Sequence, residues 1–144
     1  MLAVSGRLDP TQFGPGTLDQ NMTRRSVYFF IKRSQLIPMM MLFDWPEHLV
    51  SIGQRPVTTI APQALMFMNS PQGQDYATAF AKRLPQDAPE QTVREAWRLA
   101  FGREPTAAES AACLQFLNQQ PDADQAIMNL CQTILSMNEF VYVE

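Results

Sequence analysis

DAPEQTVREAWRLAFG, residues 87–102, is the stretch of sequence that decides the fold. Asp87 stands where an N-cap side chain would accept hydrogen bonds from the first helical turn, and Pro89 suits that turn because its missing N–H needs no partner there. Gly102 suits a C-terminal stop, since glycine adopts left-handed backbone angles without strain. The apolar side chains between these ends recur at intervals of three and four: Val93, Ala96, Trp97, Ala100 and Phe101. This spacing predicts one amphipathic helix.

Two further helices are predicted on the C-terminal side of this one. Thr106 and Glu109 stand in the relation of a capping box, in which each side chain accepts from the other residue's backbone N–H. The apolar stripe that follows comprises Ala112, Cys113, Phe116 and Leu117. Asp122 or Asp124 can cap the next helix. Its repeating positions are Ile127, Leu130, Cys131, Ile134, Leu135 and Asn138. Three amphipathic helices with short links predict a bundle.

Two more helices are predicted ahead of residue 87. Pro62 suits the first turn of a helix that runs through Leu65, Met66 and Met68. Another helix, from about Gln72 to Leu84, places three bulky side chains at intervals of four on one face: Tyr76, Phe80 and Leu84.

The segment RRSVYFFIKR, residues 24–33, fits two patterns. Val27, Phe29 and Ile31 alternate as in a strand, whereas Val27, Tyr28 and Ile31 fit a helical face equally well. A lone strand would leave its backbone groups unpaired, and the sequence offers no convincing second strand. The interpretation adopted is therefore a helix.

These elements predict an all-α fold, a single helical bundle of about five or six helices. The chain has 144 residues with 46% hydrophobic content, which is enough to bury one core. Residues 1–23, rich in Gly, Pro and polar side chains, are expected to form an irregular N-terminal segment, and residues 24–144 the helical domain. The central stretch 44–59 is also expected to be irregular.

No membrane span or export signal is expected from the sequence. The longest apolar run, residues 37–43, is far shorter than the roughly 18 to 20 residues that cross a bilayer. The first ten residues, MLAVSGRLDP, have neither a basic leader nor an apolar stretch of signal-peptide length.

The charge is acidic overall but unevenly distributed. The formal net charge is −3; residues 1–60 carry six Lys or Arg against four Asp or Glu, and residues 61–144 carry five against ten. An acidic chain lacks the broad positive field that drives binding to nucleic acid. Nucleic acid is therefore excluded as an expected partner.

Five blocks of sequence occur together and in order: RRSVYFFIKR, FD, APQALMFMNSP, AWRLAFGREPTAAE and LCQTILSMNEFVYVE. In series they resemble the C-terminal portion of the DUF1553 family, also called planctomycete-specific domain 1 (PSD1). The resemblance implies the end of a larger bacterial protein of the secreted or envelope class, with a periplasmic or extracellular location. It also implies DUF1549-like and cytochrome c-like upstream domains as partners. It implies no established activity.

The cysteines do not suggest a cofactor. Cys113 and Cys131 each lie in an apolar helical pattern and are predicted to be free, buried thiols. Neither belongs to the Cys-x-x-Cys-His motif that attaches heme in cytochrome c-like modules. We therefore expect no cofactor in this chain.

His48 and Asp44 are the candidates for catalysis if the protein is an enzyme. The imidazole lies close in sequence to carboxylates that could adjust its pKa. A lone histidine lacks the usual ligand set for zinc, so no metal site is expected, and the preferred interpretation is an ordinary loop histidine. The alternative function is a carbohydrate-active enzyme whose active site is completed by upstream residues.

The basic side chains Arg24, Arg25, Arg33 and Arg55 are the candidates for binding an anion or a partner. Guanidinium groups beside apolar sequence form directed hydrogen bonds, either to the protein's own carbonyls and carboxylates or to an anionic partner such as a polysaccharide. The first interpretation is preferred. The sequence thus favours a non-catalytic structural or interaction module, and this chain by itself is not expected to be an enzyme.

Overall fold

The computed structural model describes residues 1–32, 34–43, 45, 53 and 61–142. These residues form seven α-helices and one 3-10 turn, η1 (Ser26–Tyr28), and they contain no strand beyond two isolated bridges. The helices are α1 (Pro38–Leu42), α2 (Ala61–Asn69), α3 (Pro71–Ala81), α4 (Pro89–Phe101), α5 (Ala107–Gln119), α6 (Ala123–Leu135) and α7 (Asn138–Val141). The predicted all-α class is confirmed, and five of these helices match predicted ones; α1 and α7 are short additions.

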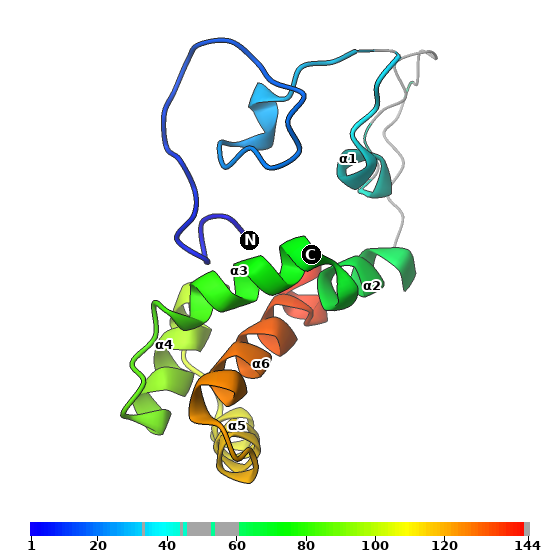
Figure 1. Ribbon diagram of the computed structural model, residues 1–144. Helices are drawn as coiled ribbons and strands as arrows, with labels where there is room; N and C mark the ends of the chain where they lie inside the picture. The colour runs from blue at the N-terminus through cyan, green and yellow to red at the C-terminus, as the bar shows by residue number, and fades with distance from the viewer. Residues whose placement is uncertain (33, 44, 46–52, 54–60, 143–144) are drawn as a thin grey trace. The chain divides into compact units, whose positions relative to one another are not determined.

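The chain divides into two compact units. The helical unit comprises Met1–Arg7 and Ala64–Glu144, and the loop unit comprises Leu8–Gln63. Figure 1 shows α3 to α6, which belong to the first of these units, whereas the described part of the second holds η1 and α1. Residues 24–32 therefore lie in the loop unit.

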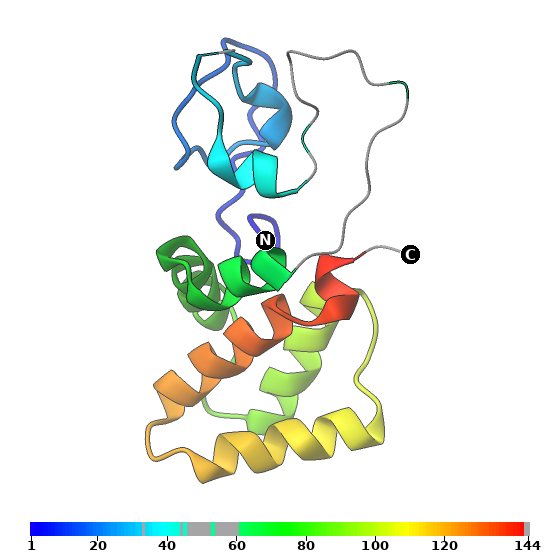
Figure 2. The ribbon, with the colours of Figure 1, turned by 90° about the vertical axis from the view of Figure 1, so that its right-hand side faces the viewer.

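The core of the helical unit lies where α6 packs along α3 and meets α4 (Figure 2). Its largest fully buried side chains include Phe80 of α3, Val93 of α4 and Ile134 of α6. Trp97 packs edge-on against Phe101, with ring centroids 5.7 Å apart. The apolar spacing that predicted these helices thus identifies the buried faces.

The predicted stripe on α5 is less buried than expected. Cys113, Phe116 and Leu117 are only half-buried, and Ala112 is exposed. The physical reason is that the main packing of α5 is against two helices, α4 and α6. A helix at the edge of a bundle has fewer neighbours to cover its stripe.

The N-termini of α5 and α6 are capped by residues that the sequence predicted. Thr106 Oγ1 accepts from the N–H of Glu109 at 3.3 Å, and a Glu109 carboxylate oxygen accepts from the N–H of Thr106 at 2.7 Å, which confirms the capping box. Asp122, rather than Asp124, caps α6 by accepting from the Gln125 N–H at 3.1 Å.

The predicted cap of α4 is wrong at its N-terminus. Ala88 is the N-cap, so Asp87 lies one residue too early for its carboxylate to cap the first turn. The hydroxyl of buried Thr92 instead donates to the carbonyls of Pro85 and Ala88 and ties the preceding loop to the helix. At the other end, Gly102 adopts φ 69°, as predicted for a left-handed stop.

The helix predicted at residues 24–33 is also wrong over the part that the structure describes. After η1 the chain is extended, and Thr17 pairs with it: its N–H donates to the Tyr28 carbonyl at 3.0 Å, and its carbonyl accepts from the Phe30 N–H at 2.8 Å. The pairing partner, Thr17, is a single residue in irregular chain. No alternating strand pattern in the sequence predicts this pairing. Extension lets the Phe29 side chain become buried while Phe30 stays exposed.

Three smaller expectations are resolved here. Residues 1–23, predicted to be irregular, contain no helix or strand. Within the described part of the chain no helix is long and apolar enough to cross a membrane. Both cysteines are free; Cys131 is buried, but Cys113 is half-buried. The predicted irregular stretch 44–59 lies outside the described residues, apart from Trp45 and Gly53.

Candidate functional site

Arg24 organises the first loop of the loop unit. Its guanidinium donates to the carbonyls of Thr11 at 3.2 Å, Pro15 at 3.4 Å and Phe13, and it lies over the Tyr28 ring, 3.6 Å from the centroid. One side chain thus satisfies three carbonyls of irregular backbone and stacks on an aromatic face. The guanidinium is already used internally, which makes it a structural clamp.

The clamp holds an exposed phenylalanine at the tip of this loop. Phe13 has φ 65°, a left-handed angle that is uncommon for a residue other than glycine, and the residue is 81% exposed. Its N–H donates to the Tyr28 hydroxyl at 2.8 Å, while its carbonyl accepts from Arg24. The loop is therefore fixed through both backbone polar groups of Phe13, and the ring is left facing water.

Exposed apolar side chains concentrate around this loop. In the described part of the chain, five of the seven large apolar residues that are exposed lie between residues 13 and 36: Phe13, Val27, Phe30, Ile31 and Leu36. We call residues 13–36 the contact segment. Three of its exposed residues, Phe30, Ile31 and Leu36, line one small hollow together with Lys32. Arg25 and Lys32 are exposed as well.

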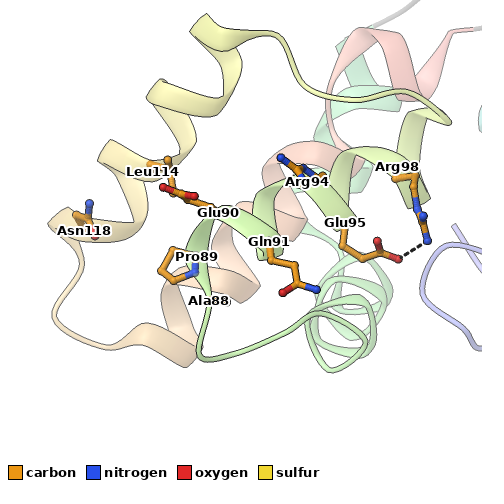
Figure 3. Close-up of a pocket in the computed structure, with 9 residues that line it drawn as sticks. All are labelled: Ala88, Pro89, Glu90, Gln91, Arg94, Glu95, Arg98, Leu114 and Asn118. Atoms are coloured by element: carbon orange, nitrogen blue, oxygen red, sulfur yellow. Dashed lines mark hydrogen bonds and ion pairs between the residues drawn. The ribbon is translucent and has the colours of Figure 1, made fainter.

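A second, polar depression lies between α4 and α5 (Figure 3). It encloses about 810 Å³ and is lined by Ala88, Pro89, Glu90, Gln91, Arg94, Glu95, Arg98, Leu114 and Asn118. Arg98 pairs with Glu95 at 3.2 Å, and Arg94 pairs with Glu104 at 3.3 Å. These pairs are largely exposed, so water and salt screen them and each contributes little to stability.

Arg103 forms the most connected ionic cluster in the described part of the chain. It makes two hydrogen bonds of 3.0 and 2.8 Å to Glu109 of α5 and two of 2.8 Å to Glu139 of α7. The hydrogen bonds from Arg103 lower the pKa of Glu109 to about 2, helped by those from Thr106, and they also lower the pKa of Glu139. The cluster joins three elements and leaves no group unpaired for chemistry.

The thiols are poor nucleophiles. Burial raises the pKa of Cys131 to about 12, and burial followed by the charge of Glu109 raises the pKa of Cys113. Both groups therefore stay protonated at neutral pH, and a protonated thiol neither attacks carbonyls nor binds metal readily. Within the described ranges, no three histidine, cysteine or acidic side chains gather as a metal site would require.

Comparison with known proteins assigns the chain to a family. A family model described as PSD1, protein of unknown function (DUF1553), matches residues 1–117. The chain belongs to the PSD1 family. The matched region of this PSD1 chain spans the loop unit and the helical unit as far as Leu117 in α5. No curated protein and no solved structure matches it.

The predicted site residues of the PSD1 chain divide into two groups. Arg24 and Arg25 lie in the described loop unit, where the first forms the clamp and the second is exposed. Arg33, Arg55, Asp44 and His48 lie outside the described residues, so their roles as anion-binding or catalytic groups stay predictions.

Two surface features were not predicted from the sequence. The arginines of the contact segment were singled out, but the exposed Phe13 that one of them holds was not, although the turn sequence FGPG is a visible signal of a loop tip. The depression between α4 and α5 was missed as well. The alternation of acid and base in PEQTVREAWR was a sign of its polar face.

Proposed function

We propose that this chain is a non-catalytic interaction module of a larger bacterial protein of the secreted or envelope class, and that the contact segment is its binding surface. The proposal rests on the concentration of exposed apolar side chains in residues 13–36. The most exposed of them is Phe13, whose carbonyl accepts a hydrogen bond from Arg24. Exposed aromatic groups on a rigid backbone are typical anchors of interfaces, because little conformational entropy is lost when they are covered.

The hydrogen bonds that Arg24 makes within the chain support this interpretation. A guanidinium that donates to three carbonyls fixes the loop geometry before any partner arrives. Holding Phe13 at positive φ costs free energy in the folded chain, and such outliers persist where surrounding contacts compensate for them. The loop is thus pre-organised to present one ring outward.

Covalent footprinting tests the proposal. The extent of labelling at Phe13 and Phe30 is compared between the purified chain and the whole protein in intact bacterial cells, with Leu65 and Met68 of α2 as exposed apolar references. We expect strong protection of the two phenylalanines in cells relative to the references. Equal labelling in both settings would contradict a role as an interaction surface.

A separate assay addresses the rival expectation of a carbohydrate-active enzyme. The chain and the full-length protein are screened for glycan binding and glycan cleavage. Binding by the chain without cleavage fits the module and adds polysaccharide to the DUF1549-like and cytochrome c-like domains as a partner. Cleavage by the full-length protein that is lost on Asp44→Ala, with folding intact, defeats the proposal.

A further inference from the structure

We propose that the partner of the contact segment is an anionic lipid surface, on which Phe13 and Phe30 insert into the headgroup region while Arg25 and Lys32 meet lipid phosphates. This inference rests on the proposed function and names the partner class. It concerns a peripheral contact, in which side chains enter the interface without any segment spanning the bilayer.

The distribution of charge favours an anionic partner. Residues 13–36 carry four Lys or Arg and one Asp, a net charge of +3, whereas the other 120 residues carry seven against thirteen, a net charge of −6. Attraction to a charged surface acts over about a Debye length, roughly 8 Å at physiological salt, so the local charge matters more than the total. Arg24 is engaged by carbonyls, which leaves Arg25 and Lys32 as the exposed cations of the described part of this segment.

The mixture of residues favours lipid over a protein surface. Lys32 lies in the same hollow as exposed Phe30 and Ile31, and the cores of protein interfaces are depleted of lysine because it must lose its water there. At a membrane surface the same neighbours are compatible, since rings reach the acyl boundary while the cations stay among the phosphates.

The backbone of the loop tip suits insertion. The polar groups of Phe13 are satisfied by Tyr28 and Arg24, so moving the tip into a region poor in water does not strip its N–H and carbonyl of hydrogen bonds. Phe13 as a whole is 81% exposed, so its ring leaves water without breaking internal packing of comparable size. The clamp therefore removes this desolvation cost for the backbone of Phe13.

Co-sedimentation with vesicles tests the inference. The chain is mixed with vesicles of phosphatidylcholine alone or with about one third phosphatidylglycerol, at low and high salt. We expect binding only to the vesicles that contain phosphatidylglycerol, weakened by salt. The double variant Phe13→Ala, Phe30→Ala should bind at least ~10-fold more weakly. Arg25→Ala with Lys32→Ala should lower binding about 25-fold, from about 1 kcal/mol per cation near the surface.

Matched variants in the helical unit make the test specific. Leu65→Ala with Met68→Ala removes two exposed apolar side chains, and Lys82→Ala removes an exposed cation; neither should change vesicle binding. Circular dichroism checks that every variant is folded.

Three results would overturn the inference: no binding to either vesicle, equal loss in the matched variants, or binding unaffected by both contact-segment variants. The proposed function has its own readout. Protection of Phe13 and Phe30 in cells without vesicle binding would reject lipid and retain a protein or polysaccharide partner.

Discussion

Replacing Thr92 by valine should destabilise the helical unit by about 1–3 kcal/mol. The side chain is fully buried, and its hydroxyl donates to the carbonyls of Pro85 and Ala88. Valine keeps the shape and the helix propensity but removes the donor, at a cost of about 1 kcal/mol for a neutral hydrogen bond. The part-buried Pro85 carbonyl then loses a hydrogen-bond partner, which adds up to about 1–2 kcal/mol.

Urea unfolding, followed by the circular dichroism signal of the helices, measures the effect. An unchanged slope of unfolding free energy against urea concentration would show that the variant differs in stability alone. Thr133→Val is the matched control, because the Thr133 hydroxyl makes the same kind of bond, to the Asn129 carbonyl at 2.9 Å, on an exposed helix face. Water can replace that bond, so the control should cost less than about 0.5 kcal/mol. If Thr92→Val costs no more than Thr133→Val, the argument that Thr92 ties the loop to α4 is refuted.

Three further predictions concern the helical unit. Thr106→Ala should lower the free energy of unfolding by about 1 kcal/mol through loss of the capping box, and Thr106→Ser should restore most of it in the same urea titration. Phe80→Ala should cost about 3–5 kcal/mol and Ile134→Val about 1 kcal/mol, since both side chains are fully buried; similar costs for the two would contradict the packing described. Glu139→Gln should lower the melting temperature at about pH 7, and the difference should shrink as the pH falls below 4.5: the pKa of Glu139 lies below its ordinary 4.5, so its stabilisation is present above that value and is lost as pH falls through the lowered pKa. A difference that persists in acid would show that Glu139 acts by packing.

The helical unit was largely predictable because its determinants are local. The spacing of Val93 and Trp97, the glycine stop at Gly102 and the pair Thr106 and Glu109 lie within single helices, and neighbours in sequence are neighbours in space there. The failure at Asp87 is an error of one residue at a helix boundary, where a buried threonine further on supplied the connection instead.

The loop unit was harder to predict because its determinants are distant in sequence. Arg24 acts on carbonyls nine to thirteen residues earlier, and Phe29 pairs with Thr17 through one isolated bridge. Carbonyl positions in irregular chain leave no trace in the residue pattern. The arginines could be recognised as hydrogen-bonding groups, but neither their partners nor the exposed ring at residue 13 could be derived from spacing.

The order of the two units along the chain has a topological consequence. Residues 1–7 belong to the helical unit, and Arg83 secures them by donating to the Ala3 carbonyl at 2.9 Å and to that of Val4. The loop unit is therefore an insertion, because the polypeptide leaves the helical unit after Arg7 and re-enters it at Ala64. A segment tethered at both ends loses less conformational entropy on ordering than a free tail of equal length, and both of its ends stay close to the helical unit. The contact segment is thus connected to the helical unit through the chain on both sides.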